Sequence, residues 1–321
     1  MIGSHHRHTL LSLIAGLTAC LTNASFGETI SPSMNLSGYG LTWQDEFNGN
    51  ALDASKWEAT TWSRRHAINT LEAVSVFDGL LRITTYTDNG THHTGFIRSK
   101  NRFEARYGFF EARIRFDSTP GEWGAFWMLA PTVGSIIGDP ANAGVEIDIV
   151  EHRVRNGDGD DISGKYVANL HWDGYDEDHK TTGSGLIEAK TDGSSIHGEW
   201  HTYGVLWTPN GYTFTFDGTP RWTTTEAVSH IPEYLKLTCE VQDDNWAGNI
   251  PEGGFGNLQS SQTFMQVDWV RVWQQPNAHP EMQPIEDQST PAGKPIQLTI
   301  QASDPDPDDT LEYSASGTSS L

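Results

Sequence analysis

Hydrophobic and polar residues alternate in short runs between about residues 38 and 275. Alternation with a period of two is typical of β-strands that bury one face, and no long stretch has the 3.6-residue period of an amphipathic helix. Turn-forming dipeptides such as Asp78-Gly79 and Asn89-Gly90 separate the runs. The pattern therefore predicts an all-β sandwich or barrel, and folds of this length occur as single domains. The clearest predicted strands are 80–86, 108–116, 204–207, 212–216 and 264–273.

The first 27 residues differ in pattern from the rest of the chain. Arg7 precedes an apolar run from Leu10 to Leu21, and small residues follow it. This arrangement is typical of an export signal peptide, and the apolar run is too short to anchor the chain across a bilayer. We therefore expect residues 1–27 to be removed and the protein to be secreted. A second interpretation stays open: Leu17-Thr18-Ala19-Cys20 resembles the bacterial lipoprotein box, in which the cysteine carries a lipid anchor at the cell envelope.

Composition changes again after Gln274. Residues 276–288 are rich in proline and polar side chains, as expected of a linker. Residues 289–321 include a predicted strand, 295–300, and an acidic run, and they resemble the start of an immunoglobulin- or cadherin-like module. Such a module needs about 100 residues to close. We therefore interpret 289–321 as a partial module.

Acidic residues outnumber basic ones: Asp and Glu total 42, Lys and Arg total 20, and the net charge is -22. This imbalance argues against nucleic acid or an anionic membrane as a partner. The chain has 12 tryptophans, which can fill a core or, beside carboxylates, stack on sugar rings. Outside the export segment Cys239 is the only cysteine, so we expect no intramolecular disulfide.

The segment Gly144–Arg153 combines a strand pattern with three carboxylates. Glu146 and Asp148 share one face of a strand, whereas strict alternation places Glu151 on the other face. A β-bulge near Ile149-Val150 would reset the alternation, so that all three carboxylates face one side. The alternative is that Glu151 lies beyond the end of the strand and points to solvent.

Three carboxylates on one face suit glycoside hydrolysis with retention of configuration. That reaction needs two carboxyl groups about 5–5.5 Å apart, one as nucleophile and one as acid/base. A third carboxylate raises the pKa of its neighbours, because like charges at close range do not all ionise. Calcium binding is the competing use of such a cluster, but calcium loops are Gly-, Asp- and Asn-rich turns and not β-branched strands. We therefore favour catalysis.

The residues 146–151 resemble the E-x-D-x-x-E signature of glycoside hydrolase family 16, in the bulged spacing of laminarinases and some galactan-active members. Four further blocks resemble family blocks in the same order. The resemblance implies a β-jelly-roll sandwich of the concanavalin A-like lectin/glucanase type, followed here by the truncated immunoglobulin- or cadherin-like segment. The four blocks are 43–47, 107–113, 123–129 and 267–273.

The resemblance also implies roles for individual residues. Glu146 would be the nucleophile, Glu151 the general acid/base, and Asp148 the residue that tunes the nucleophile. Trp127 and His171 also have purely structural interpretations, in the core and as a lone histidine. A structural calcium would match Glu46, Gly79 and Asp268, partly through backbone carbonyls, although Asp268 could simply face solvent. Catalysis itself would need no cofactor. The substrate-binding residues implied are Trp123, Trp127, His171, Asn69, Arg98, Gln242 and Trp246.

The expected function is that of a secreted, monomeric, endo-acting retaining hydrolase of a polysaccharide, with β-1,3-glucan of the laminarin type as the first substrate. Agarose, porphyran, carrageenan or mixed-linkage glucan remain alternatives, and so does a non-catalytic carbohydrate-binding protein on the same fold. Sulfated galactans need basic cleft residues, and five arginines are available. They are Arg64, Arg65, Arg98, Arg153 and Arg155.

Two features depart from the family pattern. Gly124 stands where a proline is usual between Trp123 and Ala125, and we expect it to loosen a turn. The acidic segment 173–180 after His171 has no counterpart in the pattern. Both lie near the expected cleft and therefore bear on the identity of the substrate.

Overall fold

The computed structural model describes residues 34, 36–276, 280–285, 297–304, 311 and 313. The predicted export segment 1–27, with Cys20, lies outside the described residues. Within them, no helix has the length and apolar character needed to cross a membrane. Near the C-terminus, β22 (Glu281–Met282) pairs with β23 (Ala302–Ser303), while residues 297–300 of the predicted strand 295–300 are not in a strand. The partial module at 289–321 stays a prediction.

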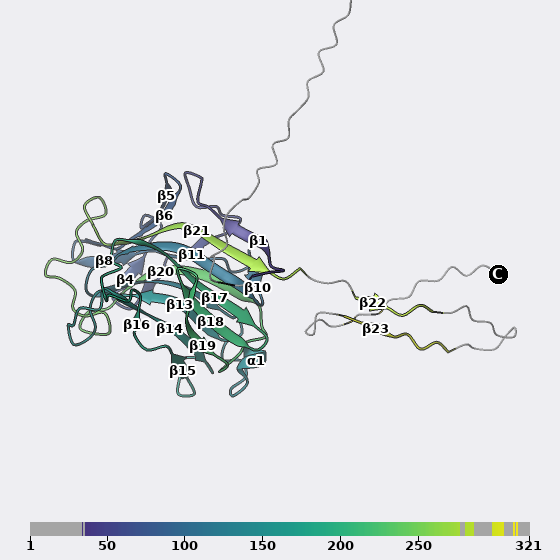
Figure 1. Cartoon of the computed structure of the whole chain (residues 1–321). Helices are drawn as coiled ribbons and strands as arrows, with labels where there is room; N and C mark the ends of the chain where they lie inside the picture. The colour runs from purple at the N-terminus through teal and green to yellow at the C-terminus, as the bar shows by residue number, and fades with distance from the viewer. Residues whose placement is uncertain are drawn as a thin grey trace, which may run out of the picture. The chain divides into compact units, whose positions relative to one another are not determined.

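Two antiparallel sheets form the body of the fold (Figure 1). The predicted all-β class is confirmed, since the described helix is the four-residue α1 (Pro140–Ala143). The eight-stranded sheet consists, in spatial order, of β19 (Thr219–Thr224), β18 (Gly211–Phe216), β17 (Trp200–Thr208), β11 (Gly108–Asp117), β21 (Phe264–Gln274), β6 (Leu80–Thr84) and β5 (Val74–Phe77), with β1 (Gly40–Asp45) paired to β21.

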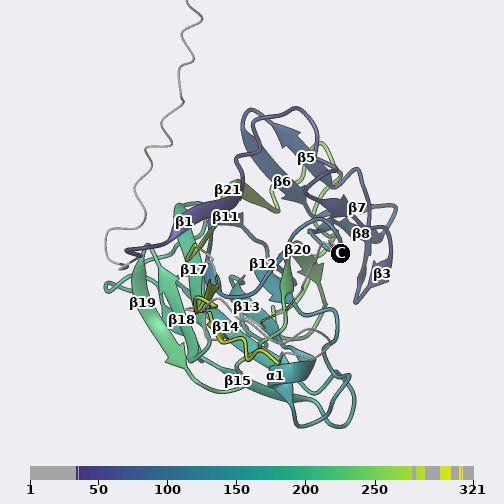
Figure 2. The same ribbon diagram turned by 90° about the vertical axis from the view of Figure 1, so that its right-hand side faces the viewer.

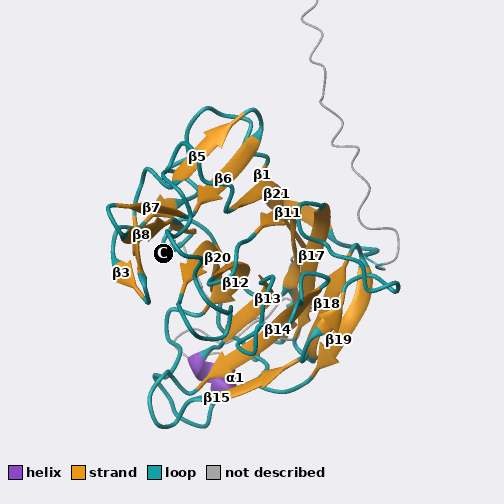
Figure 3. Ribbon diagram, turned by 90° about the vertical axis from the view of Figure 1, so that its left-hand side faces the viewer, coloured by secondary structure: helices purple, strands orange, loops and turns teal. Residues whose placement is uncertain are grey.

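The second sheet has nine strands and carries the candidate site. Figures 2 and 3 show its central strands β14, β13, β12 and β20 next to one another. The order is β15 (Lys180–Gly183), β14 (Lys165–Trp172), β13 (Glu146–His152), β12 (Glu122–Leu129), β20 (Glu233–Val241), β9 (Phe96–Arg98) and β2 (Glu58–Ala59), with β10 (Glu104–Ala105) on β20 and β16 (Ile187–Glu188) on β14. A smaller sheet joins β3 (Ser63–Arg64), β4 (Ala67–Asn69), β8 (Thr91–Thr94) and β7 (Tyr86–Asp88).

The hydrophobic core lies between the two large sheets, because alternate side chains of both point inward. On β11 the inward residues are Phe110, Ala112, Ile114 and Phe116, each at most 1% exposed. Full burial of an aromatic or branched side chain contributes roughly 1.5–3 kcal/mol. Packing of the two inward faces against each other therefore holds the sandwich together. The outer face of each sheet does not take part in this core and is available for binding or catalysis.

Gly124 does not sit in a turn, contrary to the expectation from the sequence. It lies inside β12, where a Cβ would come within 2.8 Å of ring carbons of Phe116 and 3.3 Å of Met265 Sδ. Glycine is therefore needed here for close packing of the two sheets. The prediction of a loosened turn was wrong, because the sequence around Gly124 does not reveal that the side chain of Phe116, from the other sheet, packs directly against its backbone.

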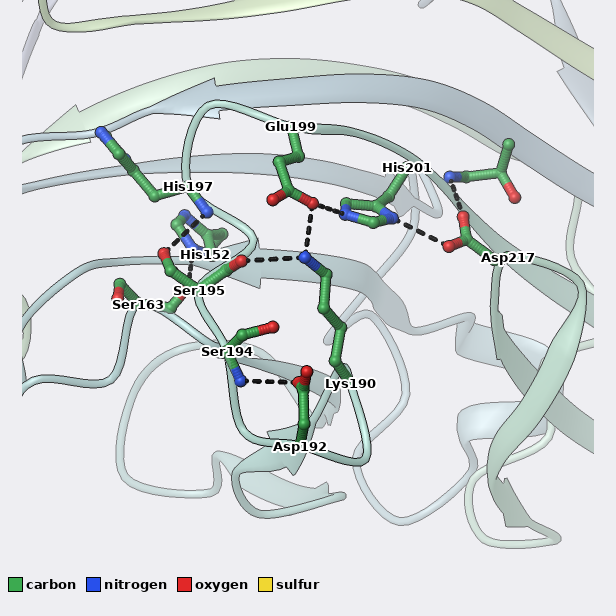
Figure 4. A network of polar contacts seen from close by, with 11 residues as sticks. His152, Ser163, Lys190, Asp192, Ser194, Ser195, His197, Glu199, His201 and Asp217 are labelled. Carbon is green, nitrogen blue, oxygen red and sulfur yellow. Dashed lines mark hydrogen bonds and ion pairs between the residues drawn. The ribbon is translucent and has the colours of Figure 1, made fainter.

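A polar network fastens the connection between β16 and β17, residues 189–199 (Figure 4). Lys190 Nζ donates to the carbonyl oxygen of Ser195 at 3.1 Å and pairs with Glu199. The ring of His201 lies between Glu199, at 3.3 Å, and Asp217, at 2.8 Å. None of these residues lines the cleft described next.

Candidate active site

The predicted bulge in β13 is confirmed by the strand registers on both of its sides. Phe126 pairs with Val150 and Trp127 with Asp148, which leaves Ile149 as the extra residue. On the other side Asp148 pairs with Asn169 and Glu151 with Val167. Ile149 and Val150 both enter the core, and Glu146, Asp148 and Glu151 all line one cleft.

This cleft lies on the outer face of the nine-stranded sheet and has a volume of about 750 Å³. The pairing registers place Asn169, Asp148, Trp127 and Lys236 in one row across four strands. Cross-strand neighbours of this kind share a face of the sheet. The lining residues are Trp62, Arg64, Arg65, Trp123, Ala125, Trp127, Leu129, Glu146, Asp148, Glu151, Asn169, His171, Tyr175, His179, Lys236, Thr238, Glu240, Gln242, Asn245 and Trp246.

Glu151 has the environment of a general acid. Although part of its side chain reaches the cleft surface, burial of the carboxyl group, followed by the nearby charge of Asp148, raises its pKa to about 8. Nδ2 of Asn169 donates to Oε2 of Glu151 at 2.8 Å, which partly opposes that rise. Glu151 therefore keeps its proton at neutral pH and can donate it.

Asp148 is 5% exposed, and burial and the charge of Glu146 raise its pKa well above the usual range. Its Oδ2 lies 3.3 Å from Nε2 of His171. A buried carboxyl group between two others holds a proton more readily than a free carboxyl group, since three charges in this space would repel one another. Asp148 can thus present a neutral hydrogen-bonding group beside Glu146.

Glu146 accepts a hydrogen bond from the hydroxyl of Tyr175. One ligand atom each of Glu146, Asp148 and His171 lies within 4.8 Å of the others, so among the described residues this set has the donor atoms to hold a metal ion. The bulged strand and the raised pKa of Glu151 instead fit a nucleophile, a tuning residue and an acid. Such a division of roles between carboxyl groups needs no metal.

The acidic segment 173–180 forms a loop that reaches back to the cleft. Asp173 is buried, accepts from the backbone nitrogen of Gly138 at 2.8 Å and pairs with Lys180 at 2.7 Å. The loop carries Tyr175 to Glu146, and it places Nε2 of His179 2.9 Å from Nδ1 of His171. Reasoning from the sequence missed both residues, because nothing in their spacing says that the loop folds over the strand.

Five of the seven predicted substrate-binding residues line the cleft: Trp123, Trp127, His171, Gln242 and Trp246. Trp123 and Trp246 meet edge to face with ring centroids 5.1 Å apart. Trp127 is 5% exposed, and its Nε1 donates to Oγ1 of Thr238 at 3.0 Å, so it forms the floor.

The other two predicted binding residues, Asn69 and Arg98, do not line the cleft. Asn69 is 3% exposed on β4, where its backbone nitrogen donates to the carbonyl of Trp62. Arg98 pairs with Glu58, with 2.6 Å between Nε and Oε2. Its position opposite Lys236 in the sheet keeps it on the same face, but beyond the cleft residues.

Basic side chains that the sequence only suggested do meet in the cleft. Nε of Arg64 and Nε of Arg65 each lie 2.6 Å from one oxygen of Glu240. Arg65 also donates to Oε1 of Gln242 at 3.2 Å. Two guanidinium groups on one carboxylate leave this end of the cleft with a local positive charge, in a chain whose net charge is -22.

The side chains expected to bind calcium are engaged elsewhere. Both oxygens of Glu46 accept from Arg271, at 2.8 and 2.9 Å, and Oδ2 of Asp268 lies 2.6 Å from Nη1 of Arg113. Gly79 occupies a turn with φ +75°. These side chains do not fit a calcium ion as they stand, and the expectation depends on the backbone carbonyls that the sequence interpretation already invoked.

Comparisons with known proteins agree on one family. A family model described as the GH16 domain of beta-porphyranases A–D matches residues 42–275. The glucan endo-1,3-beta-glucosidase A1 of Niallia circulans is 27% identical over 289 residues, 78% of this chain and 40% of that protein. The keratan-sulfate endo-1,4-beta-galactosidase of Sphingobacterium multivorum is 27% identical over 258 residues, 74% of this chain and 56% of that protein.

Solved structures give the same fold. The crystal structure of porphyranase B from Zobellia galactanivorans superposes with a TM-score of 0.57 at 26% identity, covering 72% of this chain and 90% of that chain. This chain therefore shares the jelly-roll sandwich expected from its sequence. It spans only about half the length of the two curated relatives above.

Proposed function

The chain belongs to glycoside hydrolase family 16, and from this premise we propose that it is an endo-acting retaining hydrolase of a sulfated β-galactan of the porphyran type. The observation that carries the reaction is the bulge at Ile149, which brings Glu146 and Glu151 to one face with Asp148 between them. A carbohydrate-binding protein has no need of three crowded carboxyl groups.

In the proposed mechanism Glu146 attacks the anomeric carbon while Glu151 protonates the leaving glycosidic oxygen. The bond to the leaving sugar breaks as the bond to Glu146 forms, which gives a covalent glycosyl-enzyme intermediate. Glu151, now ionised, removes a proton from water, and the water displaces Glu146 with a second inversion. Tyr175 holds the nucleophile in place through its hydrogen bond to Oε2 of Glu146.

Two observations support a sulfated galactan as the substrate. The matched family model is that of the beta-porphyranases, and the relatives include the keratan-sulfate endo-1,4-beta-galactosidase. The cleft of this acidic chain contains Arg64, Arg65 and Lys236. Arginine is well suited to sulfate-like oxyanions, because its planar fork binds two oxygens at once.

A second candidate is β-1,3-glucan, the substrate expected first from the sequence. The glucan endo-1,3-beta-glucosidase of Niallia circulans matches 78% of this chain, which favours it. The two candidates share the reaction and differ in whether the substrate carries charge.

Product analysis on porphyran, agarose, carrageenan, laminarin, lichenan and xyloglucan tests the proposal. We expect oligosaccharides from porphyran, with new reducing ends that are initially β. Glu146→Gln and Glu151→Gln should each lose about 10²–10⁴-fold in kcat, while Glu72→Gln, at an exposed position outside the cleft, keeps full activity. Turnover close to wild type in either cleft variant, or α products, would overturn the reaction; release from laminarin alone would replace the substrate.

A further inference from the structure

Lys236 lies on the cleft floor with an unusual set of contacts. Lys236 is 5% exposed, and its Nζ lies 3.5 Å from the ring centroid of Trp127. The rings of Tyr234 and Phe96 are next, at 5.4 and 5.5 Å. Within the described part of the chain, Nζ has aromatic neighbours but makes neither a hydrogen bond nor an ion pair. A buried ammonium group in this state is costly unless something else supplies an acceptor.

The carboxyl groups around Lys236 make their direct contacts with other side chains, although their charges still favour its ammonium form. Glu240 is bound by Arg64 and Arg65, one on each oxygen. Glu146 accepts from Tyr175.

Two further charged neighbours in the same row, Asp148 and Arg98, make no direct ion pair with Lys236 among the described residues. Asp148, two strands away in the same row, lies beside His171 and holds a proton more readily than a free carboxyl group. Arg98, opposite Lys236 on β9, adds a positive charge that is paired with Glu58.

Lys236 is nevertheless open to the cleft, since it is among the residues that line it. Burial lowers its pKa to about 7, and the charges of Glu146, Asp148 and Glu240 only partly oppose that shift. A negatively charged group entering the cleft over Trp127 would meet this ammonium group in an apolar surround, where a charged hydrogen bond is strong.

We propose that Lys236 is a specificity-determining residue, which binds an anionic substituent, a sulfate ester or a carboxylate, on a sugar unit of the substrate chain that reaches the cleft floor at Trp127. This inference rests on the proposed function and adds the contact that distinguishes a charged from a neutral polysaccharide. Each arginine at Glu240 pairs directly with a carboxylate oxygen, whereas Lys236 makes no direct ion pair among the described residues and interacts with Glu146, Asp148 and Glu240 only at longer range. Neutral glucans and galactans leave it unpaired.

The test compares Lys236→Met and Lys236→Arg with wild type on porphyran and on chemically desulfated porphyran. Methionine keeps the apolar contact with Trp127 and removes the charge, and arginine restores the charge. We expect Lys236→Met to lose about 10- to 100-fold in kcat/KM on porphyran, with little loss on the desulfated polymer, and Lys236→Arg to recover part of it. Agarose oxidised at carbon 6 to the uronate carries a carboxylate in place of a sulfate ester. Activity on this polymer therefore shows which of the two anionic substituents depends on Lys236. Lys165→Met, at a lysine paired with Glu188 outside the cleft, is the matched control.

Binding separates failure of this inference from failure of the proposed function. In the hydrolytically inactive Glu146→Gln background, affinity electrophoresis on porphyran should show retention that is lost on adding Lys236→Met. Equal losses on porphyran and desulfated porphyran would overturn the role of Lys236 and leave the proposed function standing. Hydrolysis and retention confined to laminarin, unchanged by Lys236→Met, would overturn both.

Discussion

Nδ2 of Asn169 donates a hydrogen bond to Oε2 of Glu151 at 2.8 Å, while its backbone pairs with Asp148. One residue of β14 therefore contacts the proposed acid, Glu151, directly and lies opposite Asp148, the proposed tuning residue. The bond stabilises the ionised form of Glu151 and opposes the larger effect of burial, which raises the pKa of that group to about 8.

Asn169→Ala should move the alkaline limb of the pH–rate profile upward. The proposed mechanism requires protonated Glu151, so the wild-type kcat/KM on a neutral polymer, which does not depend on the charge of Lys236, should fall as pH rises through about 8. Removing the hydrogen bond raises the pKa of Glu151 further, and the fall begins at higher pH. The measurement is kcat/KM from pH 5 to 10; a limb that stays in place or moves down contradicts the assignment of Glu151 as the acid.

Tyr175→Phe should lower kcat by about tenfold or more, because a hydrogen bond to an ionised group is worth roughly 1.5–3 kcal/mol. The side chain is 56% exposed, so the thermal midpoint should change little. Steady-state kinetics together with a melting curve check this. A loss of stability without a loss of kcat would mean that Tyr175 only anchors the loop.

Glu122→Gln should stabilise the protein at alkaline pH. Glu122 is fully buried in the folded protein, and this burial raises its pKa from the ordinary value of 4.5 to about 7. Between these values the folded protein keeps a proton that the unfolded chain has lost, so the free energy of unfolding falls as pH rises through this window. The shift corresponds to about 3 kcal/mol. Urea unfolding at pH 5 and pH 8 should show a gain for the variant at pH 8 alone; a gain of equal size at both pH values would contradict the ionisation argument.

Gly124→Ala should destabilise the fold by about 1–3 kcal/mol, because its Cβ would overlap the Phe116 ring. Gly40→Ala is the matched control, since a Cβ there meets nothing within 4 Å. Denaturant midpoints of the two variants decide the matter. Equal midpoints would mean that the Phe116 ring moves aside at no cost.

The part of the site that sequence reasoning predicted is the part encoded locally. Which side chains of β13 face the cleft, and where the bulge lies, can be read from seven consecutive residues. The same residues give the order of the three carboxyl groups along the strand. Lys236, Glu240 and the Arg64–Arg65 pair come from segments about 170 residues apart, and only the pairing of β20 with β12 brings them to Asp148. Asn69 and Arg98 were assigned by resemblance alone; Asn69 is buried on β4, and Arg98 pairs with Glu58 outside the cleft.

The bulge at Ile149 also has a thermodynamic consequence. Because backbone geometry, held by two neighbouring strands, aims Glu146 and Glu151 at the same space, their orientation is settled when the protein folds. The two core side chains Ile149 and Val150 hold that stretch from below. Little conformational entropy then remains to be lost by the carboxyl groups when a sugar chain arrives, so more of the binding free energy is available to orient the glycosidic bond.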